Sequence, residues 1–187
     1  MTFYRITDDM YAAACWQLGE ISSASGPVDA WRFTTGKLFE NLSPLSVMCI
    51  QGDQLDFNMA HFEVPIVSSK AALILEDLAE ADLQLSPVEI LGLGSSGGKW
   101  FILNVISQMA CIEERESVFT KWSAEDGRSE KTGKYRMVPK LRVKGTMLES
   151  KHLTRIENWK VPIIVSGVVK AKFEEASVTG AVFEPVT

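Results

Sequence analysis

Short β-branched runs followed by helical spacing occur twice along this chain, a fixed distance apart. Ile66-Val67-Ser68 and Ile164-Val165-Ser166 are separated by 98 residues, and Pro87-Val88 and Pro185-Val186 repeat at the same offset without a gap. Each run is typical of a strand ending in a serine that can cap a helix by accepting a backbone N–H bond. Roughly a dozen helical residues follow, and then a second strand whose proline suits a sheet edge or a strand end. The pattern predicts two duplicated strand–helix–strand units.

The two predicted helices differ on their outer faces. Helical periodicity places a core-facing stripe on each helix, formed by Ala71, Leu75 and Leu78 with Ile74 beside them, and by Val169, Phe173 and Ala176. On the opposite face of the first helix, Leu73 lies among Ser69, Glu76, Asp77 and Glu80, where the second helix has Ala171. Either another loop covers Leu73, since single exposed leucines are common, or Leu73 is the apolar anchor of an interface with a charged rim.

Further strands are predicted at 3–6, 45–50, 99–106, 135–138 and 141–143, whereas most of the first sixty residues look irregular because glycine, serine and proline interrupt them. The fold class is therefore α+β, with mixed or antiparallel sheets and two pseudo-repeated strand–helix–strand units. We expect a single domain over residues 1–187, which allows two packed lobes at approximately 1–120 and 121–187.

The composition is that of a globular protein, with 46% hydrophobic and 23% charged residues among 187. The longest apolar runs, 86–94 and 161–169, are too short to span a bilayer, so no membrane association is expected. Arg5, Asp8 and Asp9 lie where an export signal would need apolar residues. We therefore expect a cytoplasmic protein.

The formal charge of −5 is unevenly distributed. Residues 1–120 carry six Lys/Arg against 16 Asp/Glu, a charge of −10, and residues 121–187 carry 13 against eight, a charge of +5. An acidic surface of this size repels nucleic acid but suits a basic protein partner.

None of the candidate chemical motifs has the context that it needs. Cys15, Cys49 and Cys111 are odd in number and widely spaced, which favours free thiols over disulfides or a zinc site. The segment 92–98 matches both a dinucleotide fingerprint and, around Ser96, a nucleophile elbow, but a strand is predicted on either side of it instead of a following helix. His61 and His152 lie in no recognisable motif. We expect no catalytic residue, cofactor or metal.

The basic segment 121–160 has 11 Lys/Arg against five Asp/Glu, and it includes Trp122, Tyr135 and Trp159. Cations and aromatic rings together can bind nucleic acid. Because acids are interspersed and the rest of the chain is acidic, a solvated face is the preferred interpretation.

The order of several short motifs resembles a known family. They are Trp16-x-x-Gly19, Asp56-Phe57, Val64-Pro-Ile-Val-Ser68, Pro87-Val-Glu-Ile90, Trp100-Phe-Ile-Leu-Asn104, Cys111-Ile112, Ser117, Ile164-Val-Ser166 and Gly180-Ala-Val-Phe-Glu-Pro-Val186. Together they resemble the eleventh family of polymorphic-toxin immunity domains, formerly a domain of unknown function. The sequence departs from the family pattern at Glu113-Glu114, where an Asp is expected, and the segment 121–145 looks particular to this chain.

The resemblance implies a non-enzymatic protein that binds and neutralises a cognate toxin delivered by a type VI or contact-dependent system. The family pattern supplies no catalytic residues. For the toxin-binding surface, the residue pattern indicates Leu73, Glu76, Asp77 and Glu80. A homodimer through exposed sheet edges is allowed, and nucleic acid is not expected as a partner. The alternatives are a small enzyme using the 92–98 loop and a histidine, or a nucleic-acid or adaptor module built on 121–160.

Overall fold

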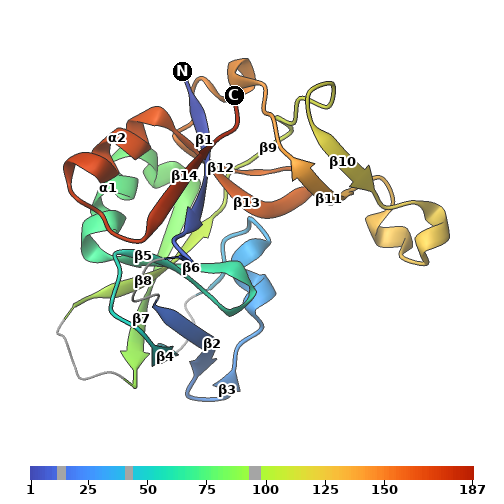
Figure 1. Cartoon of the computed structure of the whole chain (residues 1–187). Coiled ribbons are helices and arrows are strands. Elements are labelled where there is room, and N and C mark those ends of the chain that lie inside the picture. Colours follow the sequence, from blue (N-terminus) through green and yellow to red (C-terminus); the bar gives the residue numbers. More distant parts are fainter. Residues whose placement is uncertain (12–15, 41–43, 93–97) are drawn as a thin grey trace.

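The structure, a computed structural model, describes residues 1–11, 16–40, 44–92 and 98–187. Two sheets and a projecting hairpin make up the molecule (Figure 1). In spatial order, the seven-stranded sheet contains β3 (Gly26–Pro27), β2 (Gln17–Ser23), β4 (Leu45–Gln51), β7 (Leu83–Leu91), β8 (Trp100–Val105), β6 (Val64–Ser68) and β5 (Phe57–Ala60). The five-stranded sheet contains β14 (Ala181–Pro185), β1 (Phe3–Asp8), β13 (Trp159–Ser166), β12 (Leu153–Ile156) and β9 (Gln108–Met109).

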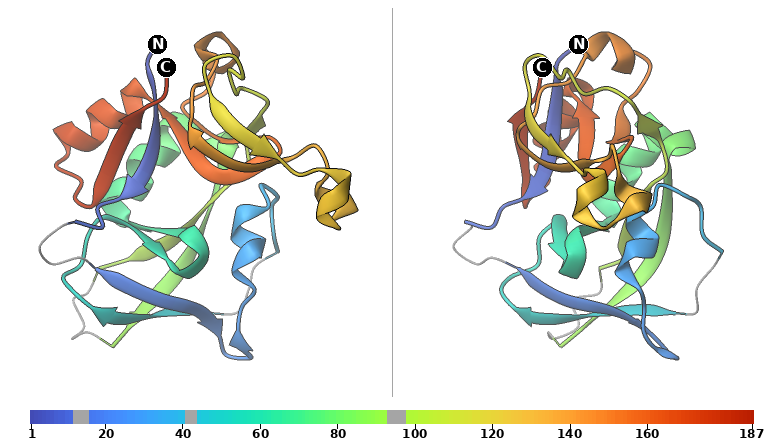
Figure 2. Two further views of the ribbon diagram at one scale, coloured as in Figure 1. Left: turned by 45° about the vertical axis from the view of Figure 1, so that its right-hand side comes forward. Right: turned by 90° about the vertical axis from the view of Figure 1, so that its right-hand side faces the viewer.

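The helices α1 (Ser69–Ala79) and α2 (Gly167–Glu175) lie side by side, and β10 (Val118–Lys121) pairs with β11 (Tyr135–Lys140) in the hairpin (Figures 1 and 2). Short 3₁₀ turns complete the described chain: η1 (Ala30–Thr34), η2 (His61–Glu63), η3 (Glu80–Asp82), η4 (Ala124–Asp126), η5 (Ser129–Lys131) and η6 (Gly145–Leu148). Both sheets contain antiparallel and parallel pairs. The predicted α+β class with mixed sheets is confirmed.

The two strand–helix–strand units have the same topology, which confirms the pseudo-repeat. In β6–α1–β7, the strand β8 lies between β6 and β7 and is antiparallel to both. In β13–α2–β14, β1 has the corresponding place between β13 and β14. The register also repeats, because Pro87 lies opposite Phe101 and its counterpart Pro185 lies opposite Tyr4. The central strand, however, follows the unit in one case and comes from the N-terminal segment in the other.

Each helix begins where the sequence predicts. The hydroxyls of Ser68 and Ser166 accept hydrogen bonds of 3.4 Å from the backbone N–H groups of Ala71 and Val169, which leaves fewer unpaired donors in each first turn. The predicted core stripe is confirmed for most of its residues, including Leu75 and Phe173. The prediction for Ala176 is wrong, because α2 ends at Glu175 and Ala176 is exposed.

Hydrophobic packing joins the two sheets. One core cluster includes both helices together with Val67 and Leu103 of the larger sheet and Val165 of the smaller one. On the other face of the larger sheet, Ile66 and Ile102 pack in a second cluster with Phe33 of η1. Successive side chains of a strand point to opposite faces of the sheet, so β6 and β8 contribute alternate residues to the first and the second cluster. A third cluster fills the space beneath β11 and η6 and includes Cys111 and Leu148.

The structure differs from the sequence predictions in several places. The predicted strands at 3–6 and 45–50 form as β1 and β4, but the first sixty residues also contain β2 and β5, where no strand was predicted. The strand β2 contains irregular register steps between Gln17 and Ile21, which weaken the alternating pattern that would have revealed it. The predicted strand at 141–143 does not form, and only Val143 makes an isolated bridge, to Ile112. The two sheets also do not divide the chain at residue 120, because β1 and β9 belong to the five-stranded sheet; the division into domains stays a prediction.

The basic segment forms a protrusion. We call residues 118–140 the arm: β10 and β11 with the connecting turns η4 and η5 at the tip. The arm extends away from the sheets in Figure 1 and in the left-hand view of Figure 2. A capping box between Ser123 and Asp126 and a left-handed Gly127 shape the tip.

Candidate protein-binding surfaces

The surface predicted on the first helix is exposed as expected. Leu73 is 65% exposed, and Glu76, Asp77 and Glu80 are also exposed around it. We call these four residues the α1 acidic face. Leu73 is therefore not covered by a loop. Whether the α1 acidic face binds a partner stays a prediction.

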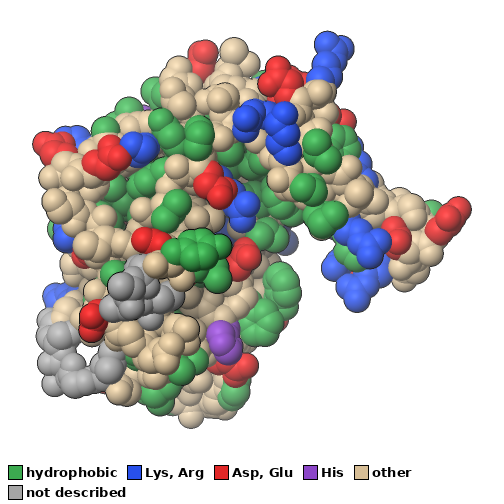
Figure 3. All heavy atoms as spheres, viewed as in Figure 1, with side chains coloured by type: hydrophobic (Ala, Val, Ile, Leu, Met, Phe, Trp, Pro, Cys, Tyr) green, Lys and Arg blue, Asp and Glu red, His purple; other side chains and the backbone are tan. Residues whose placement is uncertain are grey.

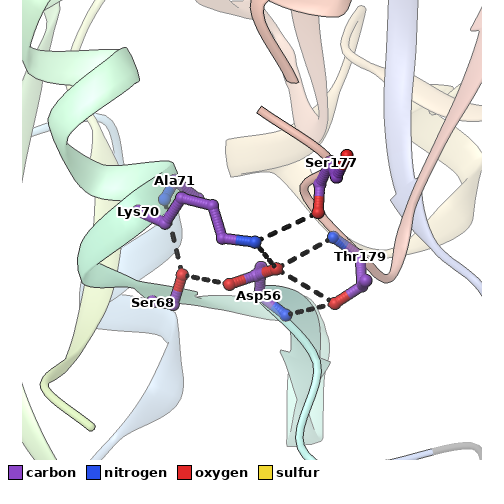
Figure 4. Close-up of polar contacts among 6 residues, drawn as sticks. All are labelled: Asp56, Ser68, Lys70, Ala71, Ser177 and Thr179. Atoms are coloured by element: carbon purple, nitrogen blue, oxygen red, sulfur yellow. Dashed lines mark hydrogen bonds and ion pairs between the residues drawn. The ribbon is translucent and has the colours of Figure 1, made fainter. Parts of the chain in front are cut away.

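A polar network at Asp56 joins the two pseudo-repeated units (Figure 4). Its carboxylate accepts a 2.7 Å hydrogen bond from the Ser68 hydroxyl, and it also accepts bonds of 3.0 and 3.1 Å from the backbone N–H and hydroxyl of Thr179. The Lys70 ammonium lies 2.7 Å away and also donates to the Ser177 carbonyl. The start of α1 is thus tied to the loop between α2 and β14.

The electrostatics of Asp56 follow from these contacts. Burial by itself would raise the pKa of the carboxyl group, but the Lys70 ammonium and the bonds from Thr179 and Ser68 outweigh burial and lower it. The carboxylate stays ionised, with both oxygens bonded inside the fold. Such an arrangement stabilises structure and does not present a free acid or base.

The second unit repeats this contact with a histidine. His152 Nδ1 lies 2.8 Å from the Ser166 hydroxyl, and the backbone N–H of Ser166 donates to the His152 carbonyl, as that of Ser68 donates to the Asp56 carbonyl. Ser166 is fully buried and caps α2, so its hydroxyl is not open to a substrate. The pairing of His152 with a serine therefore has a structural explanation.

Other reactive groups are dispersed. His61 is exposed in η2 beside the Phe62 ring, and Ser96 lies outside the described residues, as do Cys15 and most of the glycine-rich loop. The flanking strands β7 and β8 are antiparallel neighbours, which confirms the strand–loop–strand context. Cys49 and Cys111 are free and buried, and burial raises the pKa of the Cys111 thiol to about 11. Within the described ranges, no three His, Cys, Asp or Glu side chains are placed to hold a metal ion.

A concave surface lies between the arm and the rest of the described molecule, which we call the body. We call the concave surface the arm groove; its volume is about 920 Å³. Five aromatic residues and three lysines dominate its lining: Trp31, Phe62, Trp122, Tyr135, Trp159, Lys131, Lys134 and Lys160. In Figure 3, a hollow separates the projecting arm from the body, with Lys and Arg side chains on the arm and hydrophobic side chains on the facing part of the body.

Hydrogen bonds join the floor of the groove, formed by the five-stranded sheet, to the loop that follows η1. The Lys160 ammonium donates to the Thr35 carbonyl, and the Gln108 amide donates to the Gly36 carbonyl at 2.9 Å. A bond of 3.3 Å from the Tyr135 backbone N–H to the Asn158 carbonyl joins the arm to the turn between β12 and β13. The groove is therefore preformed by contacts between segments distant in the sequence.

On the body side of the groove, two large aromatic side chains are exposed. Trp31 and Phe62 are 59% and 56% exposed, and their ring centroids lie 6.1 Å apart. Phe62 has φ 61° and ψ 30°, and the next residue, Glu63, has φ 57°. A left-handed backbone is unfavourable for a bulky residue. The fold thus holds Phe62 in a costly conformation without burying its ring.

On the arm side, cations surround the aromatic rings. The charged groups of Arg128, Lys131 and Arg136 lie within 5.8 Å of the Trp122 ring centroid. Lys160 is partly buried, and its pKa is lowered by burial and by the nearby charges of Lys37, Lys134 and Arg155. These lysines and arginines come from segments far apart in the chain, so their gathering is a product of the fold.

Sequence reasoning found part of this groove and missed the rest. It singled out Trp122, Tyr135 and Trp159 within the basic segment, and the structure brings all three to the groove. Trp31 and Phe62 were not singled out, because an isolated aromatic residue in a loop gives no sign of its exposure. The α1 acidic face does not line the groove, and helix and arm extend on different sides of the molecule (Figure 1).

No helix among the described residues is long and apolar enough to cross a membrane. Residues 45–187 match the model of the immunity protein family (Imm11). No curated protein sequence matches the chain.

Proposed function

The chain belongs to the immunity protein family (Imm11), and we propose that it binds a cognate toxin and neutralises it by blocking the toxin's active site or its access to substrate. The family match over residues 45–187 carries the proposal. Occlusion without catalysis fits a protein in which Cys49 and Cys111 are buried and His152 contacts a buried serine that caps a helix. The toxin belongs to a polymorphic system using type VI or contact-dependent delivery, and the cytoplasm is the compartment of action.

We propose the α1 acidic face as one toxin contact. An exposed leucine surrounded by carboxylates has the arrangement of an apolar anchor with a charged rim. The carboxylates would also speed the capture of a basic toxin surface, because charge complementarity raises association rates. A stable complex needs on the order of 1,600 Å² of buried area, so the α1 acidic face would be one part of a larger interface.

Growth protection tests both proposals. The toxin domain encoded beside this gene is expressed together with wild-type protein, which should restore growth. Leu73→Asp should weaken binding at least tenfold by introducing a charge at the anchor position, while the melting temperature stays nearly unchanged because Leu73 is exposed. Leu38→Asp is the matched control, since Leu38 is 69% exposed in the loop between η1 and β4.

The outcomes separate the proposals. If wild-type protein does not protect against its neighbouring toxin, occlusion of that toxin is wrong. If it protects and Leu73→Asp binds as well as Leu38→Asp, only the α1 acidic face is excluded. Protection that is lost on changing His61, His152 and Ser96 together, with binding and stability retained, would favour the enzyme alternative.

A further inference from the structure

We infer that the arm groove binds an acidic segment of the toxin, one that presents carboxylates to the lysines and apolar side chains to the exposed aromatic rings. This inference rests on the proposed function, because it takes the toxin as the occupant. Three features of the groove support it: its exposed aromatic residues, its strained backbone and its positive charge.

The aromatic residues favour a protein partner. Tryptophan, tyrosine and arginine are the residue types most enriched among those that dominate binding energy at protein interfaces. The groove contains three tryptophans, a tyrosine and a phenylalanine, and Trp31 and Phe62 expose more than half of their surface. The exposed parts of Trp31 and Phe62 contribute little to the stability of the isolated protein, so their position at one concave surface indicates a docking site.

The backbone at Phe62 points the same way. Consecutive left-handed residues that are not glycine cost stability, and such strain concentrates at functional sites. Here the strained turn supports a ring that remains 56% exposed beside Trp31. An asparagine or glycine would adopt this conformation with less strain. The presence of a phenylalanine in this strained turn is explained if its ring contacts a partner.

The net positive charge of the groove favours an acidic occupant. Lys131, Lys134 and Lys160 line it, against the two carboxylates of Glu63 and Glu157. Beneath it, the buried Arg155 donates to the carbonyls of Lys160 and Val161, and its Nε and Nη2 have no hydrogen-bond partner among the described residues. Arg128 and Arg136 add positive charge around Trp122. A carboxylate entering the groove would reduce the repulsion among these groups.

Single-stranded nucleic acid fits the groove less well. Base stacking needs open aromatic faces, but three cations already surround the Trp122 ring. The Tyr135 hydroxyl is bonded to Glu114, and Lys121 lies 4.8 Å from the centroid of its ring. Glu63 and Glu157 would also repel phosphates. A peptide with a few carboxylates and apolar side chains matches this mixed lining better than a polyanion does.

Charge reversal with a matched control tests the inference. In the full-length protein, Lys131→Glu/Lys134→Glu removes two groove cations, and Lys140→Glu/Lys144→Glu makes the same change in net charge at two exposed lysines that do not line the groove. Binding of the neighbouring toxin domain, with its active site inactivated, is measured by calorimetry. The groove variant should bind at least tenfold more weakly than the control, and the difference should shrink at high salt.

A crosslinking experiment identifies the occupant. A photoreactive phenylalanine replaces Phe62, and the same group at Ile50, which is exposed on β4 outside the groove, serves as the control. Crosslinks from position 62, but not from position 50, should fall in a toxin peptide rich in Asp and Glu. Reversing the acids of that peptide should restore binding to Lys131→Glu/Lys134→Glu.

Three results would overturn the inference while leaving the proposed function intact. The first is full protection and equal affinity for groove and control variants. The second is a crosslinked toxin peptide without acidic residues. The third is a fluorescent 12-nucleotide single strand that binds wild-type protein, is released by the groove charge reversal and is not displaced by the toxin. Failure of wild-type protein to bind the toxin would contradict the proposed function itself.

Discussion

Asp56 and His152 hold the same place in the two pseudo-repeated units but differ in chemistry. Asp56 directly precedes β5, which pairs with β6, and His152 directly precedes β12, which pairs with β13. Each contacts the serine that caps the helix of its unit. Only Asp56 reaches across to the other unit, through Thr179 and through the shared Lys70 ammonium. The polar part of the contact between the units therefore depends on the ionised state of one carboxyl group, whereas hydrophobic packing of the two helices supplies the rest.

We predict that Asp56→Asn lowers the free energy of unfolding at pH 7 by about 1–3 kcal/mol, since it replaces the charge-assisted bonds from Ser68 and Thr179 and the ion pair with Lys70 by weaker neutral contacts. The pKa of Asp56 is lower in the folded protein than in the unfolded chain, so its stabilisation is present above the unfolded value of about 3.9 and is lost as pH falls toward the folded value. Urea denaturation at pH 7 and at stepwise lower pH should show the wild type and variant converging in acid. The exposed Asp53→Asn is the control; equal curves for all three proteins would contradict the prediction.

At the level of elements, β1 is the central strand of the second unit, as β8 is of the first. Each lies between the two strands of its unit and is antiparallel to both. In the first unit the central strand follows β7 through a hairpin connection. In the second, β14 ends where β1 begins, since the backbone N–H of Val186 donates to the Phe3 carbonyl and that of Phe3 to the Thr187 hydroxyl at 3.2 Å. The N- and C-terminal ends lie next to each other (Figure 1).

A permuted chain tests this equivalence. We predict that a protein running from Trp16 to Thr187, then through a short Gly–Ser linker to residues 1–15, folds with the same circular dichroism spectrum and melts within a few degrees of the wild type. The linker would give the second unit the hairpin connectivity of the first. A chain lacking residues 1–15 should fail to fold, because β13 and β14 lose the strand between them. If the permuted chain does not fold, β1 and β8 share a position in their units, but the second unit cannot accept the chain connectivity of the first.

At this scale, features that depend on local spacing could be predicted from the sequence, whereas pairing between distant segments could not. The serine caps, the core stripes and the 98-residue repeat depend on local spacing, and they could be predicted. The insertion of β8 and β1 into the two units depends on pairing between distant segments, for which one sequence carries no local signal. The same holds for the arm groove: its basic and aromatic composition was visible, but Trp31 and Phe62 join it only through the fold.

At the scale of the whole molecule, β14 forms one end of the five-stranded sheet, whereas its counterpart β7 is interior and pairs with β4. An exposed sheet edge can pair with a second copy of itself. We predict a homodimer through β14, detected by sedimentation as a species of twice the 20.7 kDa chain mass. Val182→Lys on this edge should shift the protein toward monomer, whereas Val161→Lys, on another exposed position, should not. A wild-type protein that sediments as a monomer at every concentration would exclude this dimer.

The position of β1 has a consequence for synthesis in the cell. Phe3 pairs with Ser166, and at about 5–20 residues per second the ribosome needs roughly ten to thirty seconds to make the intervening chain. During that interval β1 has no neighbour in its sheet, and the unpaired strand is open to chaperones or to aggregation. The smaller sheet can close only at the end of translation. A newly started chain therefore reaches its complete fold only after a delay that the topology sets.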